Sequence, residues 1–206
     1  MEIMDLIAAQ REDLATILGG LPEQTWGSPT LCELWRIREV VAHMTMPFRY
    51  SGEEFMAELG ESGGDFTALS NRLAARDAAA LSPAELTETI RVNVRHPWEP
   101  PGGGLAGALS HDVIHGLDIT VPLGAGFTVP EERLRAVLPP SPDEMSVKFF
   151  GTDLDGIELR ATDMDWTFGT GAPLTGAAQD LLLVICGRKL PTGHLDGEQS
   201  ERFTAG

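Results

Sequence analysis

The feature that most constrains the fold is the helical spacing of apolar residues in the first half of the chain. Two segments, residues 3–18 and 37–48, carry apolar side chains three and four positions apart, which predicts two amphipathic helices. The apolar positions are Ile3, Leu6, Ile7, Leu14, Ile17 and Leu18 in the first and Ile37, Val40, Val41, Met44 and Phe48 in the second. Long helices joined by turn-rich connections favour a helical bundle over a sheet-based fold.

Two further helical regions complete this bundle. One begins at residue 65 and is expected to break near its middle, where Ser82 is a suitable N-cap with Glu85 three residues later. The other covers residues 102–119, GGGLAGALSHDVIHGLDI. We therefore expect residues 1–125 to form a four-helix bundle.

The pattern changes after residue 125. A short helical piece, EERLRAVL, is followed by the proline cluster PPSPD, and residues 147–171 alternate apolar and polar side chains around Gly and Asp turns. This alternation predicts a small antiparallel sheet, and residues 174–190, LTGAAQDLLLVICGRKL, predict one strongly apolar helix. Residues 126–206 are thus expected to form a second, α+β domain, and the fold class of the whole chain is α+β.

Charge and cysteine content restrict the partners. The formal net charge of -16 argues against nucleic-acid binding and against acidic membrane surfaces, because both need clustered Lys and Arg. The acidic, amphipathic N-terminus does not resemble a secretory signal. Only two cysteines are present, without CxxC spacing, which fits a reducing cytoplasm. We expect a cytoplasmic monomer or homodimer that acts on small molecules.

Two of the five histidines lie one helical turn apart, at His111 and His115. On a helix they share one narrow stripe with small residues before them and an aspartate after them: Gly104, Ala108, His111, His115 and Asp118. Imidazoles on a face lined by small residues leave room for a ligand. The pair by itself is equally compatible with metal binding and with a structural role.

A catalytic zinc site usually has three protein ligands and one open position, so a third ligand must come from a facing helix. His43 borders the apolar face of the second predicted helix and is the candidate; alone it would be interpreted as a hydrogen-bonded core residue. His96 and His194 lie in predicted loops without helical partners, and we leave them out of the site.

The segments SPTLCELWRIREVVAHM and HDVIHGLDI together resemble the DinB-like superfamily, and especially its mycothiol-dependent maleylpyruvate isomerase family. Trp35 and His43 match the family's tryptophan and first metal ligand, and His111 and His115 match its later pair of ligands. The resemblance continues through DWTF and the DLLLVICGRKL helix, so it covers most of the chain in the right order.

The resemblance implies a divalent metal, zinc, held by His43, His111 and His115, and a low-molecular-weight thiol, mycothiol, bound to it through sulfur. The isomerases that gave the family its name are similar but tend to have a carboxylate where this chain has His111. A set of three histidines is more similar to the ligand set of the thiol S-transferase branch of the DinB-like proteins. A neutral third ligand leaves more positive charge on the metal, which favours a bound thiolate.

Arg188, at the end of the last predicted helix, is the candidate for binding a carboxylate of thiol or substrate, although the helix dipole explains an arginine there equally well. The function expected is thiol-dependent S-transfer or cis-trans isomerisation of a small electrophile such as maleylpyruvate. Two alternatives stay open: a metal-dependent hydrolase, and a non-catalytic small-molecule-binding protein of the same fold.

Overall fold

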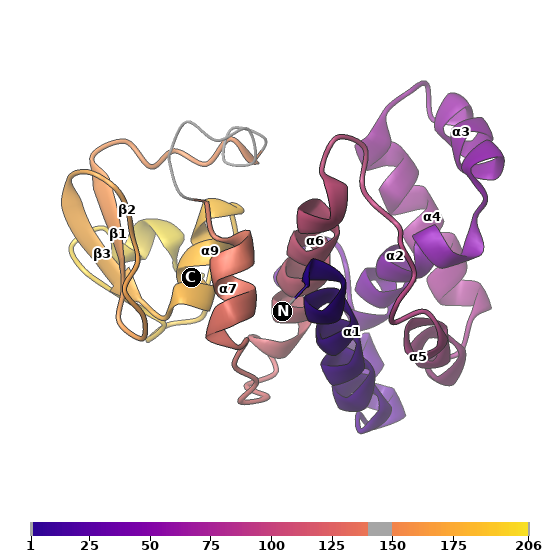
Figure 1. The fold of residues 1–206 in the computed structure, drawn as a ribbon, viewed down its shortest axis with the longest axis horizontal. Helices are drawn as coiled ribbons and strands as arrows, with labels where there is room; N and C mark the ends of the chain where they lie inside the picture. The colour runs from indigo at the N-terminus through magenta and orange to yellow at the C-terminus, as the bar shows by residue number, and fades with distance from the viewer. Residues whose placement is uncertain (1, 140–149, 206) are drawn as a thin grey trace. The chain divides into compact units, whose positions relative to one another are not determined.

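The computed structural model describes residues 2–139 and 150–205. The chain divides into two compact units, Met1–Gly116 and Leu117–Gly206, and the division falls inside one helix, α6 (Gly104–Thr120). The first unit is helical, and the second contains a small sheet (Figure 1). The predicted α+β fold class is confirmed. Independent folding of residues 1–125 stays a prediction.

The N-terminal unit is built from helices that pack through their apolar faces. It contains α1 (Ile3–Gly19), the 3-10 helix η1 (Glu23–Gly27), α2 (Ile37–Arg49), α3 (Gly52–Glu61), α4 (Phe66–Ala80), α5 (Pro83–Val92) and most of α6. α2 packs against α4 and α5, and α1 packs against α5. The core includes Leu14, Leu18, Ile37, Val40, Leu73, Leu86, Leu109 and Val113, all almost fully buried.

The predicted break in the third helical region lies between α4 and α5. α4 ends at Ala80, and Ser82 then caps α5: its hydroxyl accepts a hydrogen bond from the Glu85 amide, while the Glu85 carboxylate accepts one from the Ser82 amide. Pro83 occupies the first turn, where no backbone donor is needed. The sequence signal for this helix start is confirmed.

α3 was not predicted: its apolar residues Phe55 and Leu59 lie one turn apart, but none of its residues is fully buried. It lies on the outside of the unit beside α4 (Figure 1). Its Glu58 carboxylate pairs with Arg72 at 2.6 Å and with Arg76 at 2.7 Å, both on α4. Charged contacts, a Ser51–Glu54 capping box and the packing of Phe55 and Leu59 against a buried apolar cluster therefore hold this helix.

The C-terminal unit contains α7 (Glu131–Val137), β1 (Ile157–Ala161), β2 (Thr167–Gly169), β3 (Ala172–Gly176), α9 (Ala178–Ile185), β4 (Leu195–Asp196) and the 3-10 helix η2 (Ser200–Phe203). The strand order is β2-β1-β3-β4, and α9 packs against β1 and β3. The predicted helical piece after residue 130 is present as α7, and the apolar last helix as α9. The bounds predicted for the last helix, residues 174–190, are wrong, because Leu174–Gly176 belong to β3 and the helix ends at Ile185.

The prediction of an antiparallel sheet is wrong for one pair of strands. β1 pairs with β2 and β3 with β4 in antiparallel fashion, but β1 and β3 are parallel. After β2 the chain turns closely around the start of β1. A Cβ atom at Gly169 would lie 2.6 Å from the Ile157 carbonyl oxygen, and one at Gly171 only 2.0 Å from that of Gly156. These two glycines permit the tight passage to the other side of β1.

Two predicted features lie partly outside the described residues. These are the proline cluster after its first residue, and residues 147–149 at the start of the predicted sheet.

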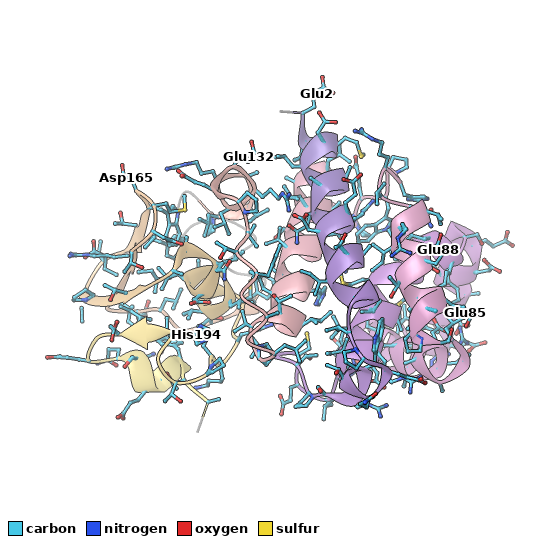
Figure 2. All side chains as sticks on the ribbon, turned by 90° about the horizontal axis from the view of Figure 1, so that it is seen from below. Glu2, Glu85, Glu88, Glu132, Asp165 and His194 are labelled. Carbon is cyan, nitrogen blue, oxygen red and sulfur yellow. The ribbon has the colours of Figure 1, made fainter. Side chains whose placement is uncertain are left out.

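Acidic side chains point outward in both units: Figure 2 labels Glu2, Glu85, Glu88, Glu132 and Asp165, all exposed. Across residues 2–139 and 150–205, no helix has both the length and the apolar character that a membrane crossing requires.

Candidate metal centre

The structure brings the three predicted ligands together in the N-terminal unit. His43 comes from α2, and His111 and His115 come from successive turns of α6. One ligand nitrogen from each ring lies within 4.8 Å of the other two, and all three residues are half-buried. Nε2 of His43 and Nε2 of His111 lie 3.2 Å apart.

Two tryptophans stand beside these rings. The indole of Trp35 lies 4.8 Å from the His43 ring, measured between centroids, and that of Trp98 meets the His111 ring edge-on at 5.1 Å. Both tryptophans are half-buried. Trp26, in contrast, is a buried core residue of η1.

A tight turn over residues 32–35 holds two side chains against the histidines. The Trp35 amide donates to the Cys32 carbonyl at 3.1 Å, and Leu34 between them has a φ of 72°, an uncommon value for a residue with a Cβ. The turn places Sγ of Cys32 3.7 Å from Nδ1 of His115. The turn beside the histidines therefore contains one residue, Leu34, in a strained backbone conformation.

Behind His111 lies a buried polar chain. Nδ1 of His111 is 3.1 Å from Oδ1 of Asp112, and Oδ2 of Asp112 accepts a 2.6 Å hydrogen bond from Nε of Arg11 on α1. Nη1 of Arg11 also donates to the backbone carbonyls of Asn93 and His96. The chain therefore connects α1, α6 and the segment that leads to Trp98.

The other candidates have separate partners. The guanidinium of Arg188 binds Asp118 through two hydrogen bonds of 2.9 Å and also donates to the Cys186 carbonyl. Asp118 follows His115 by one turn on α6. Glu39 accepts from the Arg36 backbone and side chain at the start of α2, so it serves as a helix cap.

The two histidines left out of the site have other surroundings. His96 packs against Phe48, and burial together with the nearby Arg11 charge lowers the pKa of its imidazole. His194 pairs with Asp180 at 3.0 Å in the C-terminal unit, where Figure 2 shows it beside β4. Burial raises the pKa of the Asp180 carboxyl.

Sequence reasoning missed Arg11 and Asp112 and did not assign Cys32 to the site. Asp112 directly follows His111, a predicted ligand, which is a usable signal. Arg11 is 101 positions away in the sequence, and its helix is otherwise amphipathic. Cys32 lies within the segment that matched the family. Its contact with His115 depends on the turn, which the sequence does not mark with a glycine.

Comparison with known proteins agrees with the resemblance drawn from the sequence. Residues 7–96 match the family described as mycothiol maleylpyruvate isomerase N-terminal domain. The match includes His43 and ends before α6, so it does not reach His111 and His115.

Two similar curated sequences are uncharacterized proteins of Mycobacterium tuberculosis, from strains CDC 1551 and H37Rv. Each is 26% identical over 233 aligned positions, which cover 96% of this chain and 90% of the relative. The crystal structure of a mycothiol-dependent maleylpyruvate isomerase matches with a TM-score of 0.60 at 15% identity, covering 96% of this chain and 92% of the other. A histidine-to-alanine mutant of such an isomerase matches at 0.55, with 13% identity and the same coverage. These structures show a shared fold.

Proposed function

We propose that the chain is a metal-dependent enzyme in which His43, His111 and His115 hold one divalent ion, zinc. The observation that carries this proposal is the 3.2 Å separation of the two Nε2 atoms. Two nitrogens that each bind a tetrahedral zinc at about 2.0–2.1 Å are expected about 3.3 Å apart. The three neutral nitrogen donors suit zinc and leave one position open for a further ligand.

We further propose that this position takes the sulfur of a low-molecular-weight thiol, mycothiol. A bound zinc ion stabilises a thiolate near neutral pH. The family match of residues 7–96 supports the choice of thiol. Trp35 and Trp98 shield the ligand rings with apolar surface, which limits the access of water to the sulfur.

The thiolate would then attack a small electrophile. If it displaces a leaving group, the reaction is an S-transfer; if it adds to an activated double bond such as that of maleylpyruvate, rotation and elimination give an isomerisation. Arg188 is proposed to bind a carboxylate of thiol or electrophile. Its side chain is 17% exposed and held in one orientation by Asp118, which favours a fixed anion contact.

The net charge of -16 supports small-molecule partners over nucleic acid. The chain has only two cysteines, without CxxC spacing, which supports a cytoplasmic location. These assignments belong to the same proposal.

Cobalt substitution tests the proposal. The Co(II)-loaded protein should develop a thiolate-to-metal absorption band when mycothiol is added, and it should turn over a general electrophile such as monochlorobimane. Cys32→Ser should keep both properties, because the protein thiol is not the nucleophile. A loaded protein without a band would favour the hydrolase or the binding protein. A band already present before mycothiol is added, and lost in Cys32→Ser, would instead assign the thiolate to Cys32.

A further inference from the structure

Arg11 is a fully buried charged side chain whose purpose the fold alone does not explain. Its side chain is 1% exposed and that of its partner Asp112 is 3% exposed. Placing such a pair in the interior costs several kcal/mol of desolvation per ion, so a buried ion pair commonly contributes little net stability compared with apolar residues of similar size. The pair lies directly behind a proposed metal ligand.

The two oxygens of Asp112 face two different groups. Oδ2 accepts from Nε of Arg11, and Oδ1 lies 3.1 Å from Nδ1 of His111. An ionised carboxylate has acceptors only, so the hydrogen of the neutral His111 ring must be on Nδ1. Its lone pair is then on Nε2, the atom that lies 3.2 Å from Nε2 of His43.

We infer that the Arg11–Asp112 pair selects the Nδ1–H tautomer of His111 and thereby presents its Nε2 lone pair to the metal. The inference rests on the proposed metal centre. Arg11 touches neither metal nor substrate, and it acts as a positioning residue through Asp112. A carboxylate behind a histidine ligand fixes both the tautomer and the ring orientation.

Arg11 also holds in place a second neighbour of the His111 ring, the segment that leads to Trp98. Nη1 of Arg11 donates to the carbonyls of Asn93 at 3.1 Å and of His96 at 3.0 Å. This segment continues directly to Trp98, whose indole meets the His111 ring edge-on. One buried guanidinium therefore orders two of the neighbours that confine His111.

Asp112→Asn tests the pair because an amide cannot accept from both neighbours. The amide oxygen is expected to face the charged Arg11, since charge-assisted hydrogen bonds are the stronger ones. The NH2 group then faces His111 and shifts its hydrogen to Nε2. Zinc affinity should fall 10- to 100-fold, the usual effect of losing such a partner, and nitrogen NMR of the metal-free variant should show an Nε2–H ring.

A double variant separates positioning from structure. With Arg11→Met added to Asp112→Asn, the amide oxygen can turn to Nδ1 of His111, so zinc affinity should recover to within a few-fold of wild type. A pair with only a structural role predicts the opposite, since two losses in the core would leave the double variant no better than the single one. Absence of recovery would overturn the inference.

Asp77→Asn is the matched control, because it breaks another Arg–Asp pair in the same unit, between the buried Asp77 and the half-buried Arg49 at 2.8 Å. It should lower the melting temperature without changing zinc affinity. Nitrogen NMR of wild-type, metal-free protein at pH 8 needs no variant and should show Nδ1–H at His111; an Nε2–H ring would refute the inference. Zinc binding by Asp112→Asn equal to wild type would refute it too, whereas failure of wild type to bind zinc would contradict the metal centre itself.

Discussion

Nε2 of His43 and Nε2 of His111 lie 3.2 Å apart, although 68 positions separate the two residues in the sequence. Two ring nitrogens at this distance either form a hydrogen bond with each other or bind the same metal ion. Because His115 brings a third nitrogen within 4.8 Å, the arrangement favours a shared metal ion. The predictions below follow from that interpretation.

His111→Ala should remove most of the bound metal. Loss of one of three ligands is expected to weaken binding by several kcal/mol, against the roughly 10–16 kcal/mol seen for structural zinc. Metal analysis of the purified proteins measures the effect. His194→Ala is the control, since that ring pairs with Asp180 outside the ligand set. Equal metal content in His111→Ala and wild type would rule out the ligand assignment.

Arg188→Ala should affect both stability and catalysis. Asp118 is fully buried, so removing the guanidinium that binds it through two hydrogen bonds is expected to cost about 3 kcal/mol of stability. Arg188→Lys keeps the charge but loses the two-pronged contact. Thermal melting and steady-state kinetics separate the two roles. If the Lys variant folds well and its KM for both thiol and electrophile is unchanged, the proposed carboxylate contact is wrong.

The sequence predicted the grouping of the three histidines because helical spacing is a local property. His111 and His115 are four positions apart, so any helix puts them on one face, and His43 was placed by the apolar pattern around it. The break before Ser82 followed from a capping signal that also acts locally. The structure brings these three histidines together as the sequence predicted, while their binding of a metal stays a proposal.

Features that depend on distant contacts were not predicted. The Arg11–Asp112 pair spans 101 positions, and nothing in its helix marks Arg11 as buried. The parallel pairing of β1 with β3 depends on the close approach of Gly171 to the backbone of Gly156. From the sequence alone, Gly171 is indistinguishable from a glycine in an ordinary turn. α3 carries only a short apolar pair, Phe55 and Leu59, and its ion pairs with α4 depend on contacts that the sequence does not mark.

A fragment of residues 1–125 should fold by itself. The N-terminal unit buries its own apolar faces, with α2 against α4 and α5 and α1 against α5. Thermal melting followed by circular dichroism should show one cooperative transition. A helical signal that declines gradually, without a transition, would mean that the remaining residues complete the same core.

The two cysteines should differ in reactivity. Cys186 is buried, and burial raises the pKa of its thiol to about 12, so it stays protonated and unreactive at pH 8. Cys32 is half-buried on the turn beside His115. Iodoacetamide at pH 8 should therefore label Cys32 alone in native protein and both residues in denaturant, as read by mass spectrometry. Labelling of Cys186 in native protein would contradict its described burial.

Titration of zinc-loaded protein with mycothiol in an isothermal calorimeter tests the central claim most directly. Binding at the open metal position should release heat, raise the melting temperature by mass action, and be prevented by a strong metal-directed anion such as cyanide. The metal-free protein and zinc-treated His111→Ala should show none of these effects. If zinc-loaded wild-type protein gives no heat, no thermal shift and no competition at millimolar mycothiol, the thiol-dependent function proposed for this chain is wrong.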